Sequence, residues 1–171
     1  MKDADCLKDA RDQLTLVLSF FPRVDAKLST VLAVDTGMLA AMTAGVPAIQ
    51  SISAWSILAA SIAAILLIAS LLFLYWGAFP SLKGGHSSVI FFKDIAARNE
   101  STFLEEYANE TPESLRVDVL SQVWRNSEIL SEKFRCLKVA FITMACAVGP
   151  WCISLTLFAA QRANVKVMVA H

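Results

Sequence analysis

The sequence predicts an all-α integral membrane protein, a helical bundle with about three transmembrane helices and a cytoplasmic helical insertion. Hydrophobic residues make up 56% of its 171 residues, above the roughly 45–50% that is usual in soluble domains. Residues 53–76 contain no charged side chain. A polar segment with apolar residues three and four apart, the spacing of a helix, interrupts the apolar sequence.

Residues 28–76 predict a transmembrane hairpin. The stretch 52–76 is uncharged over 25 residues, against roughly 20 that cross a bilayer, and has aromatic residues near both ends, as membrane interfaces favour. Residues 28–48 predict the first span of this hairpin, which contains Asp35 and ends at Pro47. Small residues recur four apart in both spans: Gly37 with Ala41, Ala40 with Ala44, Ala59 with Ala63, and Ala60 with Ala64. This spacing permits close helix packing in lipid, but it also arises by chance in Ala-rich helices.

Residues 136–160 predict a third transmembrane helix, kinked at Pro150 and followed by a C-terminal tail at 161–171. The basic residues of segment 77–135 place that segment in the cytoplasm together with the N-terminus, under the positive-inside rule. Arg162 and Lys166 would then lie outside, which the rule disfavours. A re-entrant third segment is the alternative.

Residues 1–27 predict an amphipathic cytoplasmic helix. Its apolar stripe, with alternating spacings of three and four, comprises Leu7, Ala10, Leu14, Val17, Phe21, Val24 and Leu28. Pro22 lies inside the stripe and predicts a bend, because proline lacks a backbone N–H.

The insertion, residues 77–135, predicts a loop followed by two helices. Val89 to Phe92 is either a short strand or a buried anchor. Thr102 and Glu105 have capping-box spacing, and Thr111 before Pro112 predicts a second helix start. No helix breaker lies between this second helix and the third span, so one helix can run over 112–160. Its predicted apolar stripe is Leu120, Val123, Ser127, Leu130, Phe134 and Leu137.

Few residues suggest catalysis or metal binding. The four cysteines form no CxxC pair and both histidines lie far from them, so we expect no metal site. His86 beside Ser87 and Ser88 would supply only part of a catalytic group, and no Gly-x-Ser-x-Gly motif is present. We therefore expect that this protein is not an enzyme. The acidic residues of 105–118 predict a solvated helix face. A net charge of zero gives no reason to expect nucleic-acid binding.

Two charged residues at membrane depth are candidates for a gate. Asp35 lies inside the first span, where an ionisable group is costly and faces a partner or water. Lys138 is the candidate partner whose predicted depth in the membrane is nearest to that of Asp35. The alternative is a hydrogen bond from Asp35 to a threonine of a neighbouring helix.

The order of short motifs resembles the membrane effector family of Pycsar anti-phage defence. The motifs are Asp25 and Lys27 before the first span, Phe-Phe-x-Asp-Ile-Ala at 91–96, and Asn126-Ser127 with Ile129, Leu130, Lys133 and Phe134 before the last span. The resemblance covers roughly residues 20–150. It implies an effector of the bacterial inner membrane that responds to cUMP or cCMP, made by a companion pyrimidine cyclase, and impairs that membrane to cause abortive infection.

No separate cyclic-nucleotide-binding domain is recognisable, so the 77–135 insertion or an oligomer interface would have to bind the ligand. We expect the nucleotide near Phe91, Phe92, Arg98, Arg125 and Asn126, since aromatic rings stack on bases and arginine suits phosphate. We expect a homo-oligomer in the lipid bilayer, with the cyclic mononucleotide as activating ligand and no other cofactor. The main alternative is a ligand-independent, holin-like pore former or a membrane scaffold subunit. A membrane enzyme acting on lipid is a third possibility.

Overall fold

The computed structural model describes residues 2–47, 52–79 and 88–169. The helices in this part of the chain are α1 (Lys2–Leu18), α2 (Phe21–Gly45), α3 (Ala54–Ala78), α4 (Phe92–Ala96), α5 (Glu100–Asn109) and α6 (Pro112–Val169). No strand occurs among the described residues. The predicted all-α class is therefore confirmed.

The chain divides into two compact units. The first comprises Met1–Val24 and Pro80–Lys133, and the second comprises Asp25–Phe79 and Phe134–His171. Helices α2 and α6 each contribute residues to both units.

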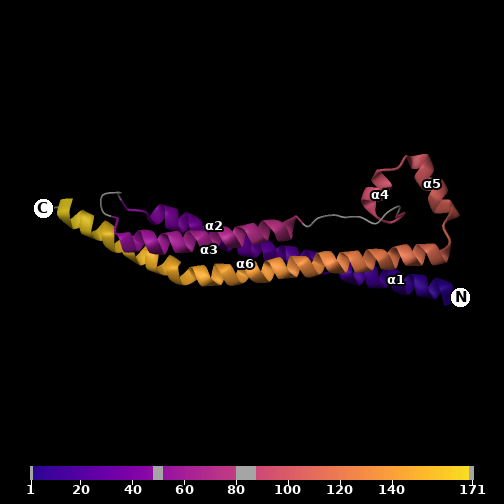
Figure 1. Ribbon diagram of the computed structural model, residues 1–171, viewed down its shortest axis with the longest axis horizontal. Coiled ribbons are helices and arrows are strands. Elements are labelled where there is room, and N and C mark those ends of the chain that lie inside the picture. Colours follow the sequence, from indigo (N-terminus) through magenta and orange to yellow (C-terminus); the bar gives the residue numbers. More distant parts are fainter. Residues whose placement is uncertain (1, 48–51, 80–87, 170–171) are drawn as a thin grey trace. The chain divides into compact units, whose positions relative to one another are not determined.

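The second unit is a bundle of α2, α3 and the C-terminal part of α6, which lie side by side in Figure 1. Three of the described helical stretches are long and apolar enough to cross a membrane, which confirms the predicted number of spans. Three buried clusters hold the bundle together, and each contains residues of all three helices. Their buried members are Leu28, Val31, Leu74 and Ala140; Met38, Leu67 and Ala147; and Met42, Ala63 and Phe158.

Helix α3 has mainly small residues on its buried face. That face consists of Ser56, Ala59, Ala63, Leu67, Ser70, Leu74 and Gly77. Bulky side chains such as Ile57, Ile65 and Leu72 are exposed instead. This arrangement suits a bilayer, because lipid solvates apolar side chains while small residues let helix backbones approach closely.

Helix α6 starts where the sequence predicts and continues through both units. The Ser114 amide donates to the Thr111 hydroxyl at 3.1 Å, an N-cap interaction. The helix then runs to Val169 and contains Pro150. Figure 1 shows it bending toward its yellow end. The predicted continuous helix is confirmed, and the third span has no re-entrant turn among its described residues.

The N-terminal stripe is confirmed by burial. Ala10 and Val24 are buried and the other stripe residues up to Phe21 are partly buried, while most of the residues between them are exposed. The helix breaks between Leu18 and Phe21. Pro22 consequently lies in the first turn of α2, where its missing N–H leaves no intrahelical bond unmade.

The predicted stripe of α6 is wrong by one residue. Leu120 and Phe134 are exposed, whereas Val119, Gln122, Lys133 and Cys136 are buried. The buried positions keep the spacing of three and four, but several carry polar groups. Gln122 donates to Ser88 at 3.3 Å, and the Lys133 ammonium lies 5.8 Å from the centre of the Phe21 ring. Tertiary partners therefore fix the buried face, and side-chain hydrophobicity alone does not.

The structure decides between the two alternatives for Val89 to Phe92 and corrects the predicted start of the helix that follows. Val89 is buried at 5% exposure and the chain enters α4 at Phe92, so the apolar run is an anchor and no strand. Helix α5 begins at Glu100 after Asn99, whose extended backbone marks the N-cap position. Thr102 and Glu105 therefore lie within the helix and do not open it.

Close packing at Gly77 provides a test of the bundle. A Cβ at Gly77 would lie 3.1 Å from the Cys136 Cβ and 3.4 Å from the Leu28 Cδ2. We expect Gly77→Val to lower the free energy of unfolding by about 1–3 kcal/mol through overpacking, measured by thermal unfolding in detergent. A Cβ at Gly149 meets nothing within 4 Å, so Gly149→Val is the matched control. Equal effects of the two substitutions would contradict the packing seen here.

Candidate functional site

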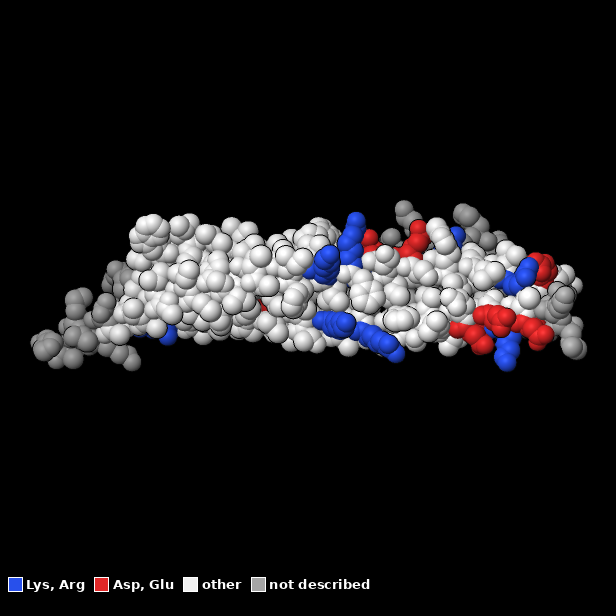
Figure 2. All heavy atoms as spheres, turned by 90° about the horizontal axis from the view of Figure 1, so that it is seen from below, with Lys and Arg blue, Asp and Glu red and all other residues white. Residues whose placement is uncertain are grey.

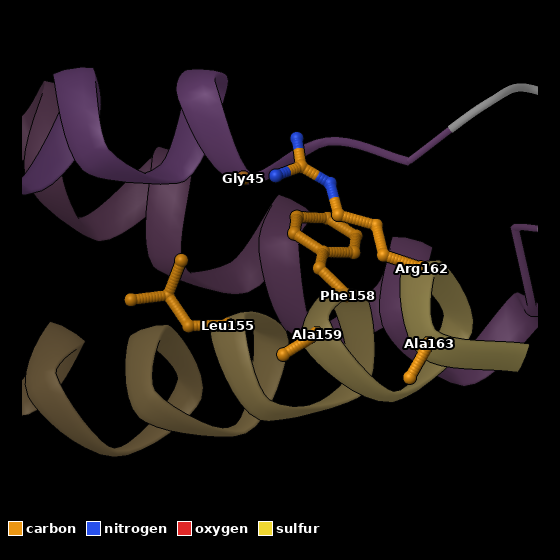
Figure 3. A pocket seen from close by; sticks show the side chains of 6 residues that line it. All are labelled: Gly45, Leu155, Phe158, Ala159, Arg162 and Ala163. Atoms are coloured by element: carbon orange, nitrogen blue, oxygen red, sulfur yellow. The ribbon is translucent and has the colours of Figure 1, made fainter. Parts of the chain in front are cut away.

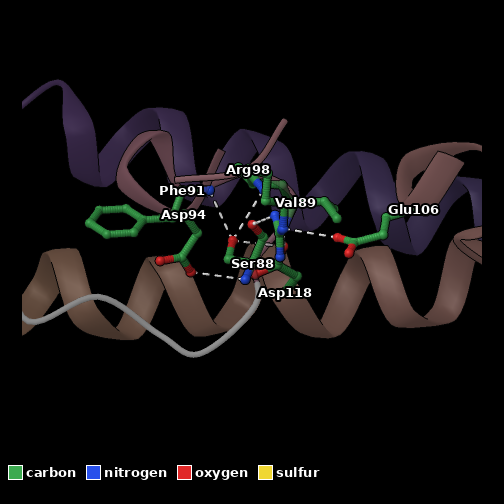
Figure 4. Close-up of polar contacts among 8 residues, drawn as sticks. Ser88, Val89, Phe91, Asp94, Arg98, Glu106 and Asp118 are labelled. Carbon is green, nitrogen blue, oxygen red and sulfur yellow. Dashed lines mark hydrogen bonds and ion pairs between the residues drawn. The ribbon is translucent and has the colours of Figure 1, made fainter. Parts of the chain in front are cut away.

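The first unit contains a polar network centred on Ser88 (Figure 4). The Ser88 hydroxyl donates to the Asp118 carboxylate at 2.9 Å. It accepts from the backbone amides of Ile90 at 3.1 Å and Phe91 at 2.9 Å. Asp118 also accepts from the Val89 amide at 3.0 Å. One serine thus folds residues 88–91 into a turn and attaches this turn to α6.

Arg98 and Asp94 attach the same turn to α4 and α5. Arg98 follows α4 and donates from Nη1 to the Ser88 carbonyl at 2.7 Å. Its Nε lies 2.9 Å from the Glu106 carboxylate of α5. Asp94 of α4 accepts from the Ser88 amide at 2.9 Å. The Arg98 side chain is only 13% exposed, so this ion pair is partly shielded from water.

One face of α6 receives the turn. Asp118, Gln122 and Asn126 recur every four residues and therefore share this face. Gln122 is buried and donates to the Ser88 hydroxyl. Asn126 donates from its amide nitrogen to the Gln122 carbonyl at 2.7 Å.

The structure brings some of the predicted ligand residues together. Phe91 and Arg98 both bond Ser88, and Asn126 lies one helical turn from Gln122 on the same face. Phe92 is 60% exposed, with its ring 5.0 Å from that of Phe91. Arg125 is half-buried on α6 beside Asn126. A role of these residues in ligand binding stays a prediction.

Local sequence patterns did not predict the residues that organise this network. Asp118 was expected on a solvated face, which is wrong, because it is half-buried and accepts two hydrogen bonds. Ser88 itself was one available signal, since a serine hydroxyl often bonds backbone N–H groups a few residues further along and so forms a local turn. His86 and Ser87, the start of a catalytic group, lie outside the described residues. The described part of the chain holds no group of three or more His, Cys, Asp or Glu residues that could bind a metal ion.

The second unit contains a buried carboxyl group at Asp35. Asp35 of α2 is 0% exposed, and neither carboxylate oxygen has a hydrogen-bond partner. Ser70 of α3 lies against it, but donates to the Ala140 carbonyl of α6 at 3.0 Å. Lys138 is exposed and lines a hollow with Lys27. No ion pair joins Asp35 to Lys138 among the described residues, so the predicted gate pair stays a prediction.

Polar contacts from α6 hold the end of this bundle at which α2 ends and α3 begins, where Figure 3 shows Arg162 beside Gly45. The Arg162 guanidinium donates to the carbonyls of Ala44 at 2.5 Å and Val46 at 2.9 Å. These bonds satisfy carbonyl groups at the C-terminal end of α2, as basic side chains often do. Gln161 donates to Ser53, the N-cap residue of α3, at 2.9 Å. A hollow of about 340 Å³ beside Arg162 is otherwise apolar.

Removing the Ser88 hydroxyl tests the network. We expect Ser88→Ala to lower the stability of the first unit by about 1–3 kcal/mol, since buried Gln122 and two backbone amides lose an acceptor. Hydrogen exchange at Ile90 and Phe91 should accelerate. The exposed Ser131 of α6 provides the control Ser131→Ala. Unchanged exchange in the Ser88 variant would show that the network does not hold the turn.

The unpartnered carboxyl of Asp35 gives a second prediction. We expect Asp35→Val to raise the free energy of unfolding by about 1–3 kcal/mol, because it removes a buried group without hydrogen bonds. Thermal unfolding in detergent measures this change. Thr36→Val is the control, since Thr36 is exposed and its hydroxyl donates only to carbonyls of its own helix. A lower unfolding temperature for Asp35→Val would mean that the carboxyl stabilises the bundle.

Comparisons with known proteins place this architecture in a family. Curated proteins gave no match, and solved structures gave none either. The family model of the Pycsar effector protein domain matches residues 9–160. This range includes most of α1, the transmembrane hairpin, the Ser88 network and most of α6. The chain therefore belongs to the Pycsar effector family, the effectors of a bacterial anti-phage defence.

Proposed function

We propose that this effector binds a cyclic pyrimidine mononucleotide, cUMP or cCMP, through its first unit and then impairs the inner membrane. The infected cell would stop growing before phage matures. One observation carries the proposal: the Ser88 network holds an arginine and an aromatic pair on the helix that continues into the transmembrane bundle. The nucleotide itself comes from the family resemblance.

The residues of the network suit such a ligand. Arg98 offers a guanidinium for a cyclic phosphate, and the exposed ring of Phe92 offers a stacking surface for the base. Asn126 carries an amide that can donate to and accept from the edge of a pyrimidine. A phosphate that competes with Glu106 for Arg98 would loosen the attachment of α5.

Helix α6 offers a route from ligand to membrane. Its Asp118 and Gln122 hold the Ser88 turn, and its Ala140, Ala147 and Phe158 belong to the bundle core. A ligand that favours one arrangement of the turn would shift the population of α6 conformations. Asp35, buried between α2 and α3 without a hydrogen bond, would become solvated when the bundle opens, which makes it our candidate gate residue.

Oligomerisation in the inner membrane is part of the proposal. Ala59 and Ala63 of α3 are used within the bundle, whereas Gly37, Ala40, Ala41 and Ala44 of α2 are exposed. An exposed small-residue face in a membrane helix supports packing against a second copy. The basic residues of the first unit support a cytoplasmic location for it.

A ligand-independent pore former remains the alternative, and thermal unfolding against a nucleotide panel separates the two. We expect cUMP or cCMP to raise the unfolding midpoint of the detergent-purified protein. The stabilisation should approach about 2.7 kcal/mol at a hundredfold excess over the dissociation constant. Purine cyclic nucleotides serve as controls. No shift with any nucleotide, together with membrane damage in cells lacking a cyclase, would favour the constitutive pore former.

A substitution locates the binding site in the same assay. We expect Phe92→Ala to reduce the cUMP- or cCMP-dependent shift while leaving the ligand-free midpoint almost unchanged, because the ring is largely exposed. Leu104→Ala is the control, since Leu104 of α5 is similarly exposed at 57%. A full nucleotide shift in the Phe92 variant would place the ligand elsewhere.

A further inference from the structure

A hollow lies on the transmembrane bundle between α2 and α6. Its volume is about 410 Å³, and it is lined by Lys27, Thr30, Val31, Phe134, Leu137, Lys138 and Phe141. The floor of the hollow is therefore aromatic and aliphatic. Its two charged lining residues are both lysines.

The hollow lies at the level where the bundle meets the membrane interface. Gly77 packs between Leu28 and Cys136, so these three residues mark one depth. Lys27 precedes Leu28 by one residue, and Lys138 follows Cys136 by two. Tyr75 and Trp76, exposed in the last turn of α3, belong to the same depth. Exposed Tyr and Trp residues are enriched at the boundary between headgroups and acyl chains.

The hollow has a polar end and an apolar end. Helices α2 and α6 both run from this boundary into the bundle, so residues later in each helix lie deeper. Val31 and Phe141 lie about one helical turn deeper than Lys27 and Lys138. Ammonium groups consequently lie at headgroup level, with an aromatic and aliphatic wall below them.

The two lysines are available for a ligand. Neither has a hydrogen bond or ion pair within the described part of the chain, and both are exposed. Figure 2 shows basic side chains gathered beside a long surface that carries almost no charge. An anion at headgroup level would balance the pair, and its apolar portion would cover Val31 and Phe141.

We infer that this hollow binds one anionic phospholipid, with its phosphate between Lys27 and Lys138 and an acyl chain along Val31, Leu137 and Phe141. The order of charge and hydrophobicity with depth matches a phospholipid. A soluble anion would leave the deeper aromatic and aliphatic wall uncovered. This inference does not depend on nucleotide sensing.

Lipid retention measures the site directly. The full chain is purified in detergent and incubated with either phosphatidylglycerol or phosphatidylcholine, and bound lipid is counted by native mass spectrometry. We expect phosphatidylglycerol to bind at one molecule per chain and more tightly than phosphatidylcholine. Each lysine near an anionic headgroup is worth about fivefold in affinity, so Lys27→Gln with Lys138→Gln should weaken phosphatidylglycerol about 30-fold.

Two matched double variants control for the change in net charge and for an effect on folding. Lys8→Gln with Lys93→Gln changes the net charge equally at exposed sites of the first unit and should leave retention unchanged. Lys27→Arg with Lys138→Arg keeps the charge and should retain the lipid, which separates charge from folding. Equal retention of both lipids, or full retention in the Lys27 and Lys138 glutamine variant, would overturn the inference. Displacement of the lipid by free cUMP at this site would do so too, by assigning the hollow to the nucleotide.

Discussion

Close approach of three helices around small residues is the constraint on which the transmembrane bundle depends. An apolar side chain is as well solvated by lipid tails as by another apolar side chain. Packing and hydrogen bonds must therefore hold the helices together. Ala63, Ala140 and Ala147 are fully buried, and Gly77 leaves room for the Cys136 and Leu28 side chains. This closeness lets Ser70 of α3 reach a backbone carbonyl of α6.

The same closeness explains where the polar residues of the bundle lie. Ser56, Ser70, Ser154 and Asp35 are all fully buried. Trp151 donates to the Met38 carbonyl at 2.9 Å, and Arg162 and Gln161 hold the end at which α2 ends and α3 begins. Most of these groups have partners, whereas Asp35 has none within hydrogen-bond distance.

The first unit follows a different principle, because polar contacts hold its short helices. Burial of α1 residues and the Ser88 network together organise it, and α4 and α5 contain no buried residue of their own. Their position consequently depends on Arg98, Asp94 and Asp118. Elements held by a few hydrogen bonds open more easily than packed ones.

The sequence alone determined the long helices and the spans. A 25-residue uncharged stretch, the Thr111–Pro112 start and the N-terminal stripe each follow from local rules of length, capping and periodicity. Only the tertiary structure decided which face of α6 is buried and that Asp118 is shielded. Hydrophobicity marks the buried face in water, whereas bulky apolar residues such as Ile57 can lie outward in lipid. Position 88 is the clearest example, because the importance of one serine depends on donors and acceptors up to 34 residues away in the chain.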